Sequence, residues 1–140
     1  MIILSVDYGD ARTGLAVCDK NEILASPLEV IAESYQPKLA KLIAEKAAEN
    51  KAELIVIGLP RNMDGSYGYR CDECRALGAV IGELCDIPVD YQDERLTTVI
   101  AHGYLSDNNV KGKKRKANVD AVSASVILQS YIDKRKNNAD

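Results

Sequence analysis

The sequence predicts an α/β fold in which helices cover both faces of one mixed β-sheet, and three observations support this prediction. Short apolar runs joined by tight turns occupy the first 31 residues. From Pro37 onward, segments with a helical spacing of apolar residues follow. Further apolar runs lie between those helical segments. The resulting order is three strands, then helix, strand, helix, strand and two helices, which gives a mixed sheet between helical layers.

Three strands are expected in the N-terminal part. Residues 2–6 are almost continuously apolar, as in a central strand that is covered on both faces. Residues 14–18 form a second run, and a third extends over residues 22–31 through Pro27. Because the connections are short, we expect these strands to pair in an antiparallel meander.

The middle of the chain alternates between helix and strand. Pro37 suits the first turn of a helix whose apolar face recurs at Leu39, Leu42, Ile43 and Ala47. Residues 54–59 are the strongest buried-strand signal, and Pro60 marks its end. A second helix is outlined by Ala76, Leu77, Val80, Ile81 and Leu84.

The C-terminal part begins with a predicted strand over residues 87–91. Thr97 or Thr98 can cap a short helix that ends at Leu105. Residues 106–116 are polar, rich in asparagine and basic, which predicts a mobile basic loop, and a final helix is expected over residues 118–134. We expect residues 1–140 to form a single domain, because this length suffices for one core but not for two.

Composition narrows the class of protein. Hydrophobic residues make up 46% of the chain and charged residues 28%, as in globular proteins. No apolar run reaches the length of a membrane span and no leader is evident, so we expect a cytoplasmic protein with no membrane partner. The net charge of −3 argues against indiscriminate coating of nucleic acid. Local charge is different, because five cations cluster at Lys111, Lys113, Lys114, Arg115 and Lys116.

The cysteines point to neither zinc nor redox chemistry. Cys71 and Cys74 form a C-x-x-C pair, but His102 is the only histidine and no second cysteine pair completes a four-ligand site. The pair also lies within a predicted helix rather than at a helix start that follows a strand. We therefore interpret these residues as reduced cysteines about one helical turn apart.

Asp120 lies on the apolar face of the last predicted helix. It precedes Ala124, Ile127 and Leu128 by offsets of four, seven and eight residues, so it shares their stripe. A favourable interaction with the helix dipole, about 0.3–1 kcal/mol, accounts for an acid at the start of a helix. It does not account for the inward face, where an unpaired carboxylate is costly. A bound cation would remove this cost.

Two further carboxylates follow predicted strands. Asp7 ends the first strand and, taken alone, fits an Asx-type turn; Glu94 follows the strand over residues 87–91 and, taken alone, fits a solvated residue paired with Arg95. Together with Asp120 they would meet at one edge of the sheet, where α/β folds bind ligands. Oxygen ligands of this kind suit Mg²⁺ or Mn²⁺, which can promote phosphodiester hydrolysis. The neighbouring basic loop would attract a polyanion that carboxylates alone repel.

A set of segments in fixed order carries a resemblance to a known family. These are Val6-Asp7-Tyr8-Gly9, Gly58-Leu59-Pro60 with Asn62-Met63-Asp64-Gly65, Asp93-Glu94-Arg95-Leu96-Thr97-Thr98, the Lys-Arg-Lys run, and Val119-Asp120-Ala121 leading into Ile127-Leu128-Gln129-Ser130-Tyr131. Over nearly the whole chain, they resemble the YqgF family of bacterial proteins. Members are described as pre-16S rRNA nucleases and, earlier, as Holliday junction resolvases.

The resemblance implies an RNase H-like fold with a five-stranded mixed sheet, three antiparallel strands followed by two parallel ones. It implies catalytic and metal-binding carboxylates at Asp7, Glu94 and Asp120, with Mg²⁺ or Mn²⁺ as cofactor. The implied activity is that of a metal-dependent endonuclease on structured nucleic acid, which trims the 5′ end of the 16S rRNA precursor. A monomer or weak homodimer is expected. Related nucleases often carry a fourth acid where this chain has Ser123.

The remaining residues of the expected site are predicted to contact the substrate. Gly9 would let the substrate approach the carboxylate closely, because it has no side chain. Nucleic-acid contacts are expected from the basic side chains near the acids, namely Arg95, Lys111, Lys113, Lys114, Arg115 and Lys116.

Three other functions remain open from the sequence. Holliday junction resolution in DNA recombination is the nearest alternative. A non-catalytic RNA-binding or transcription-associated module is another, although the retained acids argue against it. Actin-like ATPases and sugar kinases share the D-x-G hairpin, but they need two such domains, and 140 residues provide one.

Overall fold

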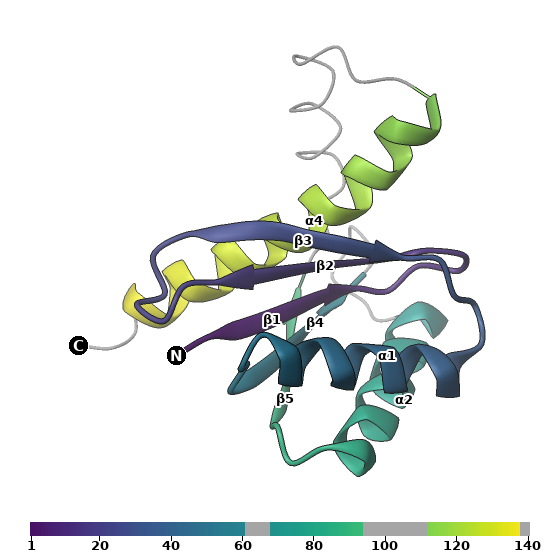
Figure 1. Cartoon of the computed structure of the whole chain (residues 1–140), viewed down its shortest axis with the longest axis horizontal. Coiled ribbons are helices and arrows are strands. Elements are labelled where there is room, and N and C mark those ends of the chain that lie inside the picture. Colours follow the sequence, from purple (N-terminus) through teal and green to yellow (C-terminus); the bar gives the residue numbers. More distant parts are fainter. Residues whose placement is uncertain (61–67, 94–111, 138–140) are drawn as a thin grey trace.

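A computed structural model of the protein describes residues 1–60, 68–93 and 112–137, the side chains of residues 112–120 excepted. Its centre is a five-stranded sheet in the order β3-β2-β1-β4-β5 (Figure 1). The strands are β1 (Ile3–Asp7), β2 (Thr13–Cys18), β3 (Ala25–Ile31), β4 (Leu54–Leu59) and β5 (Val89–Asp93). β1, β2 and β3 pair antiparallel, whereas β4 and β5 run parallel to β1. The predicted mixed sheet is confirmed.

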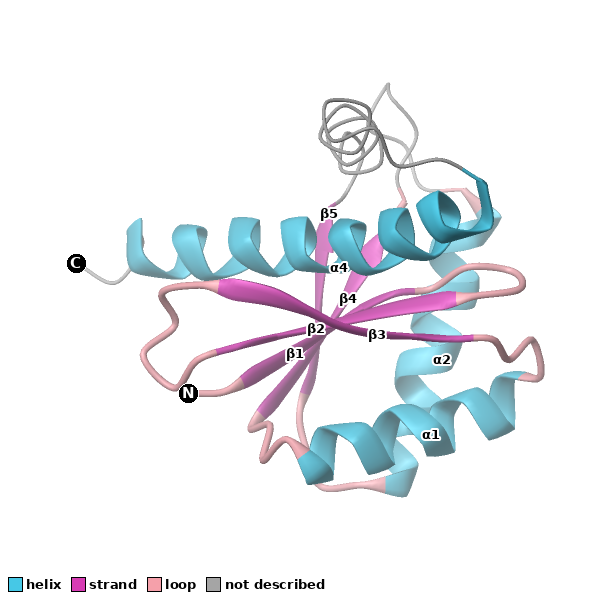
Figure 2. Ribbon diagram, turned by 45° about the horizontal axis from the view of Figure 1, so that its top comes forward, coloured by secondary structure: helices cyan, strands magenta, loops and turns pink. Residues whose placement is uncertain are grey.

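Helices cover both faces of this sheet (Figure 2). α1 (Gln36–Glu49) and α2 (Tyr69–Leu84) pack on one face, and the long helix α4 (Gly112–Asn137) crosses the other. Alternate residues of β1 divide between the two layers, because successive side chains of a strand point to opposite faces. Leu4 and Val6 join the core with α1 and α2, whereas Ile3 joins the core with α4.

The third strand begins later than predicted, at Ala25 instead of residue 22. The reason is the Asp19 carboxylate, which accepts hydrogen bonds from the backbone N–H groups of Asn21, Ile23 and Leu24 and holds them in a turn. β3 is an edge strand with a register irregularity beside Pro27, a place where a missing N–H is tolerated.

The fifth strand is displaced by two residues from its predicted range of 87–91 and covers Val89–Asp93. Pro88 has no N–H to donate, and its carbonyl accepts the N–H of Ile55 just before the ladder begins. The strand therefore starts after Pro88, and its last described residue is Asp93.

The last helix differs most from the prediction. α4 begins at Gly112, so Lys113, Lys114, Arg115 and Lys116 belong to a helix and not to the loop predicted over residues 106–116. Lysine, arginine and alanine are good helix formers, so a run of them extends a helix that a core-facing stripe stabilises. The rest of that loop, residues 106–111, and the short helix predicted up to Leu105 lie outside the described residues.

The cysteine pair lies within α2, as predicted. Cys71 and Cys74 are fully buried, form no disulfide and pack in the core with α1. None of the helices in the described ranges has the length and apolar character needed to span a bilayer.

Candidate active site

Asp7 ends β1 at the carboxyl edge of the three parallel strands, β1, β4 and β5. It shares a face with Ile3 and Ser5 by the two-residue period of the strand, which is the face that α4 covers. Asp7 pairs with Gly14 of β2, and the register of Val6 with Ile57 puts Gly58 of β4 at the same level. Glycines on both neighbouring strands therefore flank the half-buried aspartate.

α4 brings a defined turn to this edge. The Ser5 hydroxyl donates a 2.6 Å hydrogen bond to the carbonyl of Ala124, which fixes the helix over β1. The helix runs opposite to β1, since its C-terminal end lies beside the N-terminus of the chain (Figure 2). The step of two residues from Ser5 to Asp7 advances about 6.6 Å along β1. One turn of a helix advances a similar distance, about 5.4 Å. The turn beyond Ala124, toward the start of α4, contains Asp120.

Of the three predicted carboxylates, only Asp7 has a described side chain. Asp120 is placed by its backbone in α4, and Glu94 lies outside the described residues. Ser123 is 1% exposed, and within the described part of the chain its hydroxyl has no hydrogen-bond partner. A buried orphan hydroxyl three residues from Asp120 is a polar group that a hydrated ion or water could satisfy.

β5 shows which of its faces meets α4. The Asp90 carboxylate accepts a 2.5 Å hydrogen bond from the Tyr131 hydroxyl, and the Gln92 amide donates to Ser130 over 3.2 Å. Tyr91, between them, points the other way and lies against Gly78 of α2. Alternate residues 90 and 92 therefore face α4, the same side of the sheet as Asp7.

The predicted substrate-binding residues are only partly placed. Lys113, Lys114, Arg115 and Lys116 occupy the first turns of α4, so they precede Asp120 on one continuous helix. Arg95 and Lys111 lie outside the described residues. Their roles stay predictions.

Gly9 has a structural reason to lack a side chain. A Cβ atom there would lie 2.3 Å from the carbonyl oxygen of Arg12, within the tight turn that follows Asp7. The turn itself therefore requires this glycine, whereas the close approach of substrate stays a prediction.

Sequence reasoning missed one residue beside this turn. Arg70, in the first turn of α2, donates a hydrogen bond to the Tyr8 carbonyl and forms an ion pair with Asp10, each at 2.7 Å. These contacts join residues about sixty positions apart, and no local pattern signals such a pairing.

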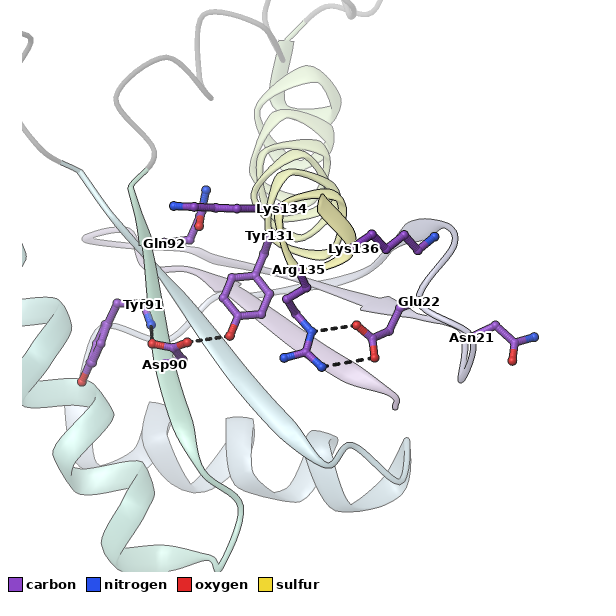
Figure 3. A pocket seen from close by; sticks show the side chains of 9 residues that line it. All are labelled: Asn21, Glu22, Asp90, Tyr91, Gln92, Tyr131, Lys134, Arg135 and Lys136. Atoms are coloured by element: carbon purple, nitrogen blue, oxygen red, sulfur yellow. Dashed lines mark hydrogen bonds and ion pairs between the residues drawn. The ribbon is translucent and has the colours of Figure 1, made fainter. Parts of the chain in front are cut away.

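An open cleft of about 660 Å³ lies at the other end of the sheet, between the last turns of α4, β5 and the β2–β3 turn (Figure 3). Its charged groups largely satisfy one another. Arg135 donates to both Glu22 oxygens, at 2.8 and 3.4 Å, and these hydrogen bonds lower the pKa of that carboxyl. Burial, then the Asp90 carboxylate, raises the pKa of Tyr131 to about 12. We assign this cleft no catalytic role, because its acids are already paired.

The candidate metal ligands at this edge are oxygen atoms. Among the described side chains, no group of three or more His, Cys, Asp or Glu residues could hold an ion. The donors proposed at the carboxyl edge are oxygens, and the buried Ser123 hydroxyl of α4 is a further oxygen near Asp120 in the sequence. This chemistry fits a hard divalent cation.

Comparison with solved structures defines the class. RuvC of Thermus thermophilus superposes with a TM-score of 0.59 at 14% identity, covering 98% of this chain and 97% of that one. The fowlpox virus Holliday junction resolvase gives a TM-score of 0.58 at 15% identity, with 96% and 99% covered. The protein therefore has an RNase H-like fold of the RuvC-like type.

Sequence comparison then gives the family. The family model described as "RuvX: Holliday junction resolvase" matches residues 1–134. A protein of Protochlamydia amoebophila named "Putative pre-16S rRNA nuclease" is 41% identical over 140 positions, covering 95% of this chain and 93% of that protein. A protein of Halothermothrix orenii with the same name is 39% identical, with 95% of each chain covered. The chain belongs to the RuvX/YqgF family, as the resemblance implied.

Membership makes the protein a nuclease, a hydrolase of phosphodiester bonds. RuvC-like nucleases generally use divalent metal ions. Thermus thermophilus RuvC and the fowlpox virus resolvase have both been solved with Holliday junction DNA.

Proposed function

We propose that the protein is a metal-dependent endonuclease whose active site consists of Asp7, Glu94 and Asp120. The observation that carries this proposal is the position of Asp7: at the end of the central strand, between two glycines, on the face where α4 contributes the turn with Asp120. The period of two in β5 predicts that same face for Glu94. Three acids at one edge would then surround one space.

Mg²⁺ or Mn²⁺ fits this donor set, and Asp7, Glu94 and Asp120 are the residues that would hold it. When bound, such an ion supplies a Lewis acid that polarises the phosphate and lowers the pKa of water. Asp7 would hold the ion from the central strand of the sheet, and Asp120 would approach it from α4, the helix that covers this face. The Ser123 hydroxyl, where related nucleases carry a further acid, contributes no charge and favours weaker binding of a second ion.

Substrate binding is assigned to the cations that precede Asp120. Lys113, Lys114, Arg115 and Lys116 lie one to two turns before it on the same helix, and Lys111 and Arg95 are predicted to join them. Their charge would offset the repulsion between a polyanion and the acids, so binding should weaken steeply with salt.

We infer that the substrate is the 16S rRNA precursor, cut near its 5′ end, because relatives at about 40% identity over nearly the whole chain carry that name. Holliday junction resolution is the second candidate. It is favoured by the family description and by the junction complexes of the two structural neighbours. A monomer or weak homodimer stays our expectation.

The decisive experiment is a cleavage assay with Mg²⁺ or Mn²⁺ on four-way DNA junctions, linear duplexes and precursor rRNA fragments. Asp7→Asn should lower the rate by about a hundredfold or more, because even residues that only support metal ligands are worth about 10- to 100-fold. Asp86→Asn is the matched control, because Asp86 is an exposed aspartate between the end of α2 and the start of β5, at the opposite edge of the sheet. Its rate should equal that of the wild type.

Each outcome of this assay has a separate meaning. Equal cleavage by the wild type and Asp7→Asn would contradict the proposed site. Preference for the junction over the rRNA fragment would select the resolvase activity. Tight RNA binding with no cleavage of any substrate would indicate a non-catalytic module instead.

A further inference from the structure

The side chain of Arg70, from α2, contacts the turn that follows Asp7. Arg70 lies in the first turn of α2 and is 22% exposed. Its Nη2 donates to the Tyr8 carbonyl at 2.7 Å, and its Nη1 contacts the Asp10 carboxylate at 2.7 Å. The guanidinium also lies 5.5 Å from the centre of the Tyr8 ring. Besides an ion pair with Glu73 of its own helix at 3.3 Å, Arg70 therefore contacts the Tyr8 carbonyl, the Tyr8 ring and the Asp10 side chain of one short turn.

These contacts differ in strength. Asp10 is 89% exposed, so its ion pair with Arg70 is screened by water and contributes little. The hydrogen bond to the Tyr8 carbonyl has a charged donor and is partly buried, which makes it the stronger contact. The position of the guanidinium near the aromatic ring adds a cation–π attraction. The strongest contacts of Arg70 with this turn are therefore those with Tyr8.

Tyr8 and Asp7 are neighbours that point in opposite directions. Tyr8 packs against the core that α1 and α2 cover, while Asp7 belongs to the face that α4 covers. Holding both the ring and the carbonyl of Tyr8 on the α2 side fixes the residue that directly follows Asp7, together with the Tyr8–Gly9 peptide unit. A displacement of Tyr8 from α2 would twist the end of β1 and turn the Asp7 carboxylate away from α4.

We propose that Arg70 is a positioning residue for Asp7: by anchoring Tyr8 to α2, it orients the carboxylate toward the turn of α4 that carries Asp120. This inference rests on the proposed function, since it gives Asp7 a task that requires orientation. Arginine suits the position because its planar fork reaches the carbonyl and the Asp10 carboxylate together, whereas a lysine ammonium provides a single point of contact.

The test compares Arg70→Ala and Arg70→Lys with Arg135→Ala. Arg135 is a closely matched control, because it also pairs with a carboxylate, that of Glu22, and lies 6.0 Å from a tyrosine ring, that of Tyr131, but at the other end of the sheet. Three quantities are measured: hydrogen exchange of the amides in residues 8–12 without metal, Mn²⁺ affinity by calorimetry, and kcat and KM for the preferred substrate.

Arg70→Ala should speed amide exchange in residues 8–12 about tenfold and weaken Mn²⁺ binding by about 10- to 100-fold, the usual effect of losing support for a metal ligand. kcat should fall by a similar factor at limiting metal, with KM for the nucleic acid changed less than twofold. Arg70→Lys should recover part of each effect, because it keeps the charge near the ring and the carbonyl. Arg135→Ala should leave all three quantities at wild-type values.

The possible failures are distinguishable. Wild-type exchange, Mn²⁺ affinity and kcat in both Arg70 variants would overturn the positioning role, even with the proposed function intact. Equal losses in Arg70→Ala and Arg135→Ala would show a general stability effect and overturn it as well. If Asp7→Asn binds Mn²⁺ and cleaves like the wild type in the same series, the proposed function fails, whatever Arg70 does.

Discussion

Gly9 illustrates how far the candidate site depends on a single missing side chain. The turn from Asp7 to β2 is so tight that the Arg12 carbonyl takes the space of a Cβ atom at residue 9. The obstacle is backbone, which cannot move aside as the end of a flexible side chain can. The turn and the orientation of Asp7 therefore depend on the same residue.

Gly9→Ala should destabilise the protein by about 1–3 kcal/mol, the usual cost of forcing an extra carbon into a filled space. Urea unfolding followed by circular dichroism measures this difference. Cleavage should fall together with stability, because the turn carries the residue that follows Asp7. A stability equal to that of the wild type would show that the turn relaxes without cost.

At the scale of elements, α2 packs on the sheet through a glycine. A Cβ atom at Gly78 would lie 2.3 Å from the Tyr91 hydroxyl and 3.3 Å from Cδ1 of Ile57, whereas one at Gly82 would meet nothing within 4 Å. Both glycines belong to the same helix and lie one turn apart. The first permits close packing of helix and strand, and the second only lowers helix propensity.

Gly82→Ala should stabilise the protein by about 0.5–1 kcal/mol through helix propensity. Gly78→Ala should instead destabilise it by about 1–3 kcal/mol, because the Tyr91 ring must shift or the helix must move away from β5. Adding Tyr91→Phe removes the nearest oxygen and should recover part of that loss. Thermal unfolding of the three variants tests this order, and similar midpoints for the two alanine variants would contradict it.

At the scale of the molecule, α4 joins both edges of the sheet. Gln129 accepts the N–H of Ala25 on β3 at 2.9 Å, and Tyr131 donates to Asp90 on β5. Arg135 pairs with Glu22 in the β2–β3 turn. One helix thus connects strands at opposite ends of the sheet order.

Tyr131 should make stability fall at high pH. Burial and Asp90 raise its pKa from 10.0 to about 12. Below pH 10 the phenol is protonated in both states, and the stabilisation is fully present. Between pH 10 and 12 only the unfolded chain loses the proton, so the free energy of unfolding should drop by about 1.4 kcal/mol per pH unit, roughly 2–3 kcal/mol in total.

Urea unfolding of the wild type and Tyr131→Phe between pH 9 and 12 isolates this effect, since the other tyrosines and the lysines titrate in both proteins. The difference between the two should shrink by about 2 kcal/mol as pH rises through this range. Parallel curves would contradict the assignment. Asp90 is exposed and keeps water as a partner, so the variant should remain folded at neutral pH.

Local patterns of apolar residues in the sequence predict most of the helices and strands. The strand Leu54–Leu59 is buried at every position, as its continuous apolar run predicts. The glycines on either side of Asp7 could not be predicted, because they come together only through strand register. The same holds for Arg70, whose partners are distant in sequence, and for the first turns of α4, where charge suggested a loop but helix propensity prevailed.

The hydrogen bonds along α4 also bear on how this family can diversify. Hydrogen bonds join Ser5 to Ala124, Gln129 to Ala25 and Tyr131 to Asp90. The helix therefore cannot slide along the sheet by one turn without breaking all three hydrogen bonds. Contacts of the body of its own helix thereby fix the axial position of Asp120. Insertions and deletions between β5 and α4 could then alter substrate preference during evolution without misaligning the two aspartates.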